Sequence, residues 1–469
     1  MSFRTFSQVM LLAAGIFAGT LGAQNQAPSI RGVVPSSGSG PFLALTAQYA
    51  DPNGFDDLKT LEILLNTTSG SLVNACYLRF DTGTNLLSLW NDAGTAAVGS
   101  VSGGAVTVEN SQCRVSLSSF SKYQLNNFDL TVSITFKSFL GLKNIYLQAG
   151  DLAAASSGWQ QSGTWTVTVN QPPSVTVLTP NTAAGTTQTF TVTYSDPDGA
   201  VDLASVEVLI NNFLDGRSSC YLAYNIPSDT LYLVADNGDA AHPMGMLLIN
   251  GSGGALQNSQ CTVTWLGSSA VFNNNELTLT LALTFSSSAF HGNKVVYTEA
   301  QDNGGNNTDW ITMGVYGVTG GPTTYPAAVA VQPNYGTTST ASITFTYDDA
   351  TNYQNLSSVE ALMNTAVDGR IACYVAYNQI YQLLFLVPDN GDAAHPISMP
   401  LNGSGTLSNS QCTITGAGSS VSGSGKRLTL ILNMTFSSAF AGHRIIWTGV
   451  QTMSNANSDW QALAPWFVP

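Results

Sequence analysis

The sequence predicts an all-β protein made of three tandem antiparallel β-sandwich domains, each with one disulfide. Three observations lead to this prediction. Landmark segments recur three times along the chain, apolar and polar residues alternate with the period of a half-buried strand, and the six cysteines fall into three pairs.

The repeat is clearest around the second cysteine of each pair, where the tetrapeptide Asn-Ser-Gln-Cys occurs three times. A tyrosine follows the first cysteine of each pair, and a tryptophan lies near the end of each copy. The landmarks return after roughly 150 residues, which is the size of a self-sufficient domain rather than of a solenoid unit. We expect repeat 1 at residues 24–170, repeat 2 at 171–320 and repeat 3 at 321–469, joined by short Pro- and Gly-rich linkers.

Strands are predicted from runs in which every second residue is apolar. Matching runs of this kind occupy residues 128–136, 277–285 and 428–436. Clusters of Gly, Asn, Asp, Ser and Pro separate the runs, and no long segment beyond the N-terminal one has a clear helical period. Short alternating strands with turn signals between them are typical of an antiparallel sandwich.

The cysteines are expected to form disulfides, because an even number in an exported chain usually does. Zinc is the alternative, but the Cys-x-x-Cys spacing of zinc sites is absent. Each bridge would close a loop of roughly 40 residues and contribute about 4 kcal/mol in the chain-entropy model. The expected pairs are Cys76 with Cys113, Cys220 with Cys261, and Cys373 with Cys412.

The first 23 residues have the pattern of a secretory signal peptide. Arg4 carries their positive charge, an apolar run follows, and the small residues Gly22 and Ala23 precede a cleavage point at Gln24. The run is too short to span a bilayer comfortably, and no later stretch resembles a membrane span. We therefore expect a protein that is secreted or held at the cell surface.

The composition fits an exported β-protein and argues against nucleic acid as a partner. The chain has 14 Lys and Arg against 28 Asp and Glu, so its net charge is 14 − 28 = −14. A polyanion would be repelled by this surface, and an anionic membrane is disfavoured for the same reason. Charged residues make up only 9% of the chain, far below the roughly 25% of typical soluble proteins.

Two segments carry a resemblance to known modules. The sequences YADPNG at residues 49–54 and YSDPDG at 194–199 each lead into a strand rich in Val or Leu. In this respect the chain resembles the immunoglobulin-like, cadherin-like and fibronectin-III-like repeats of bacterial secreted and surface proteins, over nearly all of its mature length. The resemblance implies an immunoglobulin-like sandwich. The cysteines are closer together than in true immunoglobulin domains, and each copy is longer, which implies extra strands or long loops.

The acidic turns of the first two copies suit calcium, since a hard cation prefers several oxygen ligands from one short loop. A glutamate lies eleven residues beyond the first aspartate, as in a helix-loop-helix calcium loop, but the glycine is at the wrong position. Copy three keeps only Asp349 of the set. The alternative is an Asp-Pro-Asp-Gly turn whose side chains bond backbone amides. The candidate calcium ligands are Asp51, Asn53, Asp57, Asp196, Asp198 and Asp202. No other cofactor is expected.

An aromatic pair near the end of each copy has two interpretations. Exposed rings could stack on sugars, whereas buried rings would pack in the core or between domains. The candidate glycan-binding residues are Trp159, Trp165, Trp310, Tyr316, Trp460 and Trp466.

The function expected from these features is not catalytic. An enzyme has one singular site, whereas every distinctive feature here occurs two or three times, and repetition favours reach or multivalent contact. No nucleophile elbow, zinc-binding helix or phosphate-binding loop is present in the sequence. We expect a role in adhesion, extracellular matrix or envelope architecture, with a protein or polysaccharide partner at the cell surface. A carbohydrate-binding array is the alternative, and a hydrolase with an unrecognised site is the third hypothesis.

Overall fold

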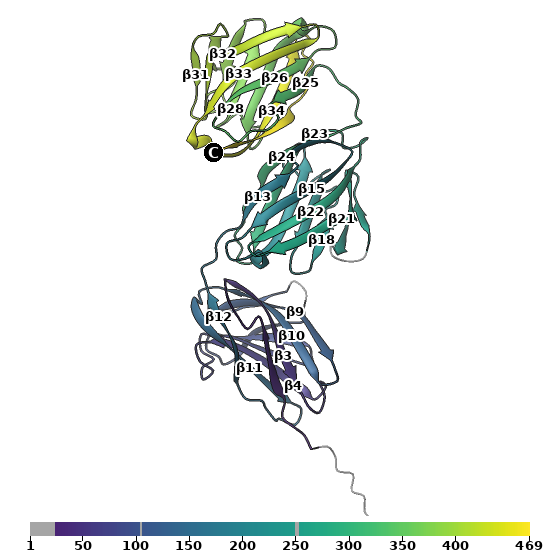
Figure 1. The fold of residues 1–469 in the computed structure, drawn as a ribbon, viewed down its shortest axis with the longest axis vertical. Helices are drawn as coiled ribbons and strands as arrows, with labels where there is room; N and C mark the ends of the chain where they lie inside the picture. Colours follow the sequence, from purple (N-terminus) through teal and green to yellow (C-terminus); the bar gives the residue numbers. More distant parts are fainter. Residues whose placement is uncertain (1–23, 104–105, 249–252) are drawn as a thin grey trace, which may run out of the picture. The chain divides into compact units, whose positions relative to one another are not determined.

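We describe the chain from a computed structural model of residues 24–103, 106–248 and 253–469 (Figure 1). The described residues form six β-sheets and three short 3-10 helices. The predicted signal peptide, residues 1–23, lies outside the described residues. Within the described ranges, no helix has the length and apolar character needed to cross a membrane.

Repeat 1 has a five-stranded sheet of order β1-β3-β10-β9-β8 and a seven-stranded sheet of order β2-β12-β11-β4-β5-β6-β7. The strands pair antiparallel, except that β2 runs parallel to β12. The strands are β1 (Ser29–Val34), β2 (Ser37–Ser39), β3 (Phe42–Ala50), β4 (Leu58–Asn66), β5 (Cys76–Asp81), β6 (Leu86–Trp90), β7 (Ala97–Val101), β8 (Val108–Glu109), β9 (Cys113–Tyr123), β10 (Asn127–Phe136), β11 (Gly141–Asp151) and β12 (Gln160–Val167).

Repeat 2 has the same topology, with sheets β13-β15-β22-β21-β20 and β14-β24-β23-β16-β17-β18-β19. A 3-10 helix, η1 (Ala200–Asp202), precedes β16. The strands are β13 (Ser174–Thr179), β14 (Thr182–Gly185), β15 (Thr187–Ser195), β16 (Leu203–Asn211), β17 (Cys220–Asn225), β18 (Thr230–Leu233), β19 (Gly245–Leu248), β20 (Ala255–Gln257), β21 (Cys261–Asn273), β22 (Glu276–Phe285), β23 (Gly292–Asp302) and β24 (Ile311–Val318).

Repeat 3 has sheets β25-β26-β33-β32-β31 and β30-β29-β28-β27-β34-β35. A single parallel bridge between Gly336 and Trp466 stands where the other repeats have a short parallel strand. The elements are β25 (Ala327–Gln332), β26 (Thr340–Asp348), η2 (Tyr353–Asn355), β27 (Leu356–Asn364), β28 (Cys373–Asn378), β29 (Leu383–Leu386), β30 (Ile397–Pro400), β31 (Thr406–Ser408), β32 (Cys412–Ser424), β33 (Arg427–Phe436), η3 (Ser438–Phe440), β34 (Gly442–Thr452) and β35 (Gln461–Val468).

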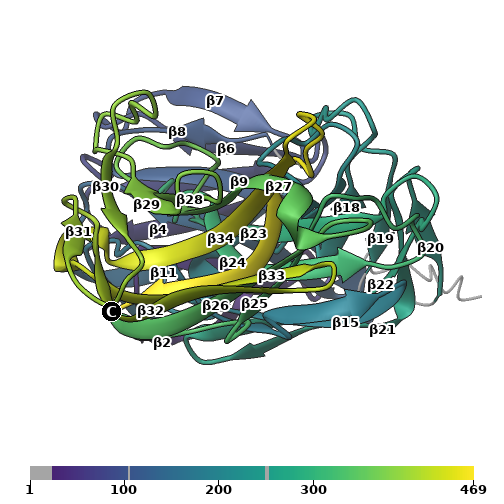
Figure 2. The same ribbon diagram turned by 90° about the horizontal axis from the view of Figure 1, so that it is seen from above.

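The two sheets of each repeat face each other, which confirms the predicted class of tandem β-sandwiches. In repeat 1 the core combines Leu45 and Val132 of the smaller sheet with Ile63 and Ile145 of the larger one. Figure 2 shows the two layers of repeat 3, with β27, β28 and β29 on one side and β26, β32 and β33 on the other. Repeat 1 forms one compact unit, and repeats 2 and 3 together form another. The exact repeat boundaries stay a prediction.

The alternating runs form strands whose apolar side chains fill the cores. In β10 the five apolar side chains from Phe128 to Phe136 are at most 6% exposed, and the residues between them are half-buried. The strands β22 and β33 repeat this pattern. A period of two places successive side chains on opposite faces of a sheet, so one face is buried as predicted.

Each repeat contains one disulfide, and the bridge joins its two sheets. Cys76 begins β5 of the larger sheet and bonds Cys113, the first residue of β9 in the smaller sheet. The other two pairs, Cys220–Cys261 and Cys373–Cys412, occupy the same places in their repeats. The predicted pairing within each copy is therefore confirmed.

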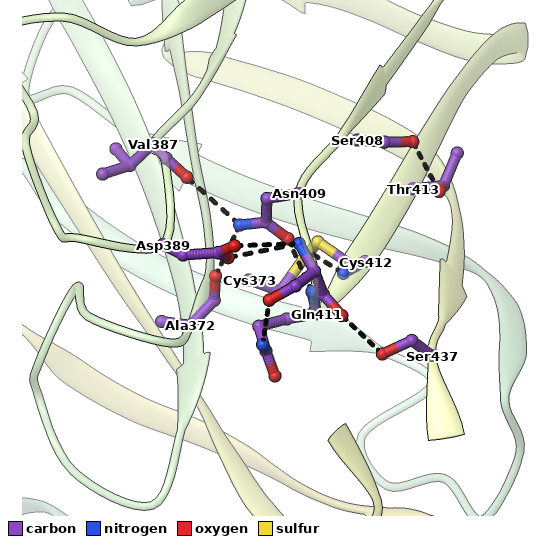
Figure 3. Close-up of a disulfide and its surroundings, with 11 residues drawn as sticks. Ala372, Cys373, Val387, Asp389, Ser408, Asn409, Gln411, Cys412, Thr413 and Ser437 are labelled. Carbon is purple, nitrogen blue, oxygen red and sulfur yellow. Dashed lines mark hydrogen bonds between the residues drawn. A yellow bond between two sulfur atoms is a disulfide. The ribbon is translucent and has the colours of Figure 1, made fainter. Parts of the chain in front are cut away.

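The asparagine of the Asn-Ser-Gln-Cys motif makes four hydrogen bonds beside the disulfide (Figure 3). In repeat 3 the Nδ2 of Asn409 donates to the carbonyl oxygens of Ala372 at 2.9 Å and Val387 at 3.1 Å. Its Oδ1 accepts from the backbone amides of Gln411 at 2.9 Å and Cys412 at 3.0 Å. One side chain thus joins the segment before the disulfide-bonded strand of the smaller sheet to two segments of the larger one.

The same four bonds form in the other repeats, which explains why the motif recurs. Asn110 bonds Ala75, Trp90, Gln112 and Cys113. In repeat 2, Asn258 makes the corresponding bonds to Ser219, Val234, Gln260 and Cys261.

We expect Asn409→Ala to lower the free energy of unfolding of repeat 3 by about 3 kcal/mol, because it leaves two carbonyls and two amides without partners. Denaturant unfolding of the full-length mature chain measures this loss. The control is Asn402→Ala, since Asn402 is exposed in a nearby loop. A loss no larger than that of the control would show that the asparagine is dispensable.

Candidate metal centre

An acidic cluster lies at one end of the sandwich in repeats 1 and 2. In repeat 1 it consists of Asp51 after β3, Asp57 before β4 and Asp151 at the end of β11. One ligand atom from each of the three lies within 4.8 Å of the others. Asp51 and Asp151 are fully or almost fully buried, and Asp57 is half-buried.

The cluster of repeat 2 has the same position and one more negative charge. Asp196, Asp198 and Asp202 again bring ligand atoms within 4.8 Å of one another. Asp302, at the end of β23, corresponds to Asp151, since it pairs with Leu203 as Asp151 pairs with Leu58.

The local turn explains how one short loop brings its oxygens together. The Oδ1 of Asp196 accepts from the amide of Asp198 at 2.8 Å, and the equivalent bond in repeat 1 joins Asp51 to Asn53 at 2.7 Å. Gly199 has a φ of 112°, a conformation that favours glycine. The loop therefore forms the Asp-Pro-Asp-Gly turn that the sequence analysis gave as the alternative to a calcium site. Its carboxylates nevertheless lie close together.

Burial and mutual repulsion act on the carboxylates of repeat 2. Burial first, and then the neighbouring charge of Asp196, raises the pKa of Asp202 to about 8. Burial also raises the pKa of Asp196 to about 6, with a further contribution from Asp302. In repeat 1, burial raises the pKa of Asp51 in the same direction. These groups are held in an environment that disfavours negative charge unless a cation compensates it.

The segment that precedes the first strand of each of these two repeats is bonded to the acidic cluster of that repeat. Asn170 donates from Nδ2 to Asp302 at 2.8 Å, and the amide of Gln171 donates to Asp198 at 2.6 Å. In repeat 1 the side chain of Asn25 donates to Asp151 at 2.8 Å. The amide of Gln26 donates to Asn53 at 2.7 Å.

Repeat 3 replaces the cluster with a hydrogen-bonded turn that keeps a single carboxylate, Asp349. Asn355 and Thr452 stand where repeat 2 has Asp202 and Asp302. The Oδ1 of Asp349 accepts from the Nδ2 of Asn355 at 2.9 Å and from the backbone and hydroxyl of Thr351. Burial raises the pKa of Asp349, but these bonds together with one from Asn352 outweigh it and hold the pKa well below its usual range.

The sequence pattern identified the candidate ligands of the acidic turn but not the aspartates at the ends of β11 and β23. Asp151 and Asp302 lie about a hundred residues beyond the turn, and only the sheet pairing brings them to it. The sequence contained one indication of them: an aspartate is present at this position in copies one and two and is replaced by a threonine in copy three. The glutamates Glu62 and Glu207 lie within strands, and Glu207 accepts a hydrogen bond from Tyr221.

Three of the six candidate glycan-binding aromatics are core residues. Trp165, Tyr316 and Trp466 are at most 8% exposed, and Tyr316 donates to the carbonyl of Thr187. A sugar has no access to these rings, so as stacking platforms they are ruled out.

The other three, Trp159, Trp310 and Trp460, are half-buried on the outer face of the larger sheets. Each contacts the tyrosine after the first cysteine edge-to-face, with ring centroids 5.7–5.9 Å apart. The contact indicates a packing role, and the glycan-binding role of these three stays a hypothesis.

The sequence and the structure were compared with known proteins. No family model and no curated protein matches the sequence. Among solved structures, fibronectin(III)-like modules of Clostridium thermocellum CbhA align with 62% of this chain and 94% of their own, at 12% identity and a TM-score of 0.20. At that TM-score the fold assignment rests on the strand topology described above.

In metal-free buffer the stability of repeat 2 should fall as the pH rises from about 4 to about 8. Asp196 and Asp202 ionise near pH 4 in the unfolded chain but at higher pH when folded, so over this range the folded state keeps protons that the unfolded state has lost. We expect a lower melting temperature at about pH 8 than at about pH 5 in the presence of chelator.

Asp202→Asn should remove most of this pH dependence, and calorimetry of the full chain measures it. The prediction would be contradicted if the melting temperatures of the wild type and of Asp202→Asn changed with pH in the same way.

Proposed function

We propose that this chain is a non-catalytic repeat protein, secreted or held at the cell surface, that acts in adhesion, extracellular matrix or envelope architecture. The observation that carries the proposal is the apolar contact between repeats 2 and 3. Domains of one chain move independently unless a large hydrophobic interface joins them. A contact of this kind makes two sandwiches into one stiff element, which suits a structural role.

The contact arises because some strands of the larger sheets are apolar on both faces. In β16, Val208 and Ile210 point into the core of repeat 2, while Leu209 is buried on the opposite face. The residues of the shared cluster are Leu209, Val295, Tyr297 and Val315 of repeat 2 with Leu362, Ala372, Ile445, Trp447 and Ala462 of repeat 3. Asn293 also donates to Gln461 across this contact at 3.3 Å.

The hydroxyl-rich outer faces support an extracellular role as well. In β15 and β22 the pairs Thr187–Thr284, Thr191–Thr280 and Thr193–Thr278 face outward from the smaller sheet of repeat 2. A surface of this kind stays hydrated with few charges, which is consistent with the 9% of charged residues. The three disulfides fit an oxidising compartment.

A carbohydrate-binding function has one observation in its favour. Repeats 2 and 3 have a depression of about 380 Å³ at the same place on the smaller sheet, beside an irregularity in β21 and β32. Hydroxyl and amide groups of this type can hydrogen-bond sugars. The polar lining residues are Thr187, Gln188, Thr189, Thr264 and Thr284 in repeat 2, and Thr340, Ser342, Thr415, Asn433 and Thr435 in repeat 3.

If the proposed structural role is correct, antibodies should label the protein on the surface of intact cells that produce it. Deletion of its gene should weaken attachment or envelope integrity. Both are measured by surface immunolabelling and by attachment and detergent-sensitivity assays, with a complemented strain as control. A protein confined to the cytoplasm, or a purified chain that hydrolyses a substrate, would contradict the proposal.

The carbohydrate alternative predicts that the mature chain binds a polysaccharide on a glycan array. Thr284→Val together with Thr435→Val should weaken the binding at least tenfold, because both hydroxyls are exposed in the depressions. Thr278→Val, in the same sheet but outside the depression, serves as the matched control. The alternative fails if the array shows no ligand or if the control weakens binding equally.

A further inference from the structure

The acidic cluster of repeat 2 contains buried oxygens that no group of the described chain satisfies. Both carboxylate oxygens of Asp202, Oδ2 of Asp196 and Oδ1 of Asn170 are buried and have no hydrogen-bond partner. Asp202 is 1% exposed and Asp196 is fully buried. An ionised carboxylate that loses water without gaining a partner costs several kcal/mol, so native proteins pair such groups or bind them to a metal.

We propose that repeats 1 and 2 each bind one calcium ion at the acidic cluster, and that the ion fixes the segment before the first strand of the repeat to the end of the sandwich. In repeat 2 the converging ligands are Asp196, Asp198 and Asp202. Asp302, at the position of Asp151, and the free Oδ1 of Asn170, whose Nδ2 donates to Asp302, complete the proposed set. In repeat 1 they are Asp51, Asp57 and Asp151, and Asp51 again has an unpartnered buried oxygen, Oδ2.

The donor set selects calcium among the common divalent cations. All the donors are oxygens, and several come from different segments of the chain, as in the flexible sites of six to eight ligands that calcium occupies. Magnesium prefers a site that leaves it several waters, whereas these oxygens are largely withdrawn from solvent. Zinc prefers nitrogen and sulfur ligands, and no His or Cys belongs to either cluster.

Repeat 3 shows what the same turn needs in order to do without a cation. Its cluster positions carry one negative charge, on Asp349, whereas those of repeat 2 carry four. The side-chain amide of Asn355 donates to Asp349. It compensates the carboxylate as a cation would compensate the carboxylates of repeat 2. The unpartnered buried atoms of repeat 3 do not belong to Asp349, Asn355 or Thr452.

The segments that enter repeats 1 and 2 share the residues that reach the cluster. Asn25–Gln26 and Asn170–Gln171 are the same dipeptide at equivalent places, and both make the bonds described above. The segment before β25 of repeat 3 lacks this dipeptide. Cluster and dipeptide are thus present together or absent together, as expected if they form one site.

Calcium titration of the full-length mature chain tests the proposal. Isothermal calorimetry after chelator treatment should show two sites per chain, and calcium should raise the melting temperature where magnesium at the same concentration does not. A stoichiometry of zero, or an equal response to magnesium, would overturn the assignment.

Substitutions separate a cation site from a purely structural turn. Asp202→Asn should lower the stoichiometry from two to one and raise the melting temperature of the metal-free protein, because it relieves repulsion. A structural role predicts a lower melting temperature and unchanged stoichiometry. The matched control is Asp349→Asn in repeat 3, which should leave two sites. Asn355→Asp combined with Thr452→Asp restores the acidic positions of repeat 3 and should yield a third, weaker site.

Hydrogen exchange tests the fixing of the segment. Calcium should slow exchange in the peptide that contains Gln171 at least tenfold, because its amide donates to a proposed ligand, Asp198. The peptide covering residues 321–327 should not change. Calcium binding with unchanged exchange at Gln171 would overturn the role of the ion in holding the segment.

Discussion

The contact between one asparagine and two carbonyls is the interaction on which each sandwich depends. Asn409 and its counterparts Asn110 and Asn258 lie where the smaller sheet begins its long strand, and each bonds two segments of the larger sheet. The disulfide adds a covalent tie within a few ångströms of these bonds. The asparagine and the disulfide therefore fix the two sheets to each other at one end of the sandwich.

Much of the fold could be predicted from the sequence because its signals are local. A period of two along β22 and β33 identifies both the strand and its buried face. The cysteine pairs could be predicted from their spacing and from the predicted signal peptide. The reason for the Asn-Ser-Gln-Cys motif could not be predicted, since the bonded carbonyls of Ala372 and Val387 lie 37 and 22 residues away from Asn409.

The candidate site was predictable only in its local half. The turn from Asp196 to Asp202 is contiguous in sequence, whereas Asp302 reaches it through the pairing of β16 with β23. The aromatic hypothesis failed at Trp165 and Tyr316 for a related reason. Both side chains point to the buried face of their strands. An aromatic residue by itself does not reveal whether its side chain lies on the buried or the exposed face of a strand.

The outward apolar face that repeats 2 and 3 share limits how this chain can be divided. A fragment ending at residue 320 would leave Leu209, Tyr297 and Val315 open to water, and the complementary fragment would do the same to Trp447 and Ile445. Exposed apolar surface of this kind promotes self-association. A gene duplication, a recombination event or a laboratory truncation therefore has to keep the two sandwiches together to keep this surface covered, although each sandwich has its own disulfide.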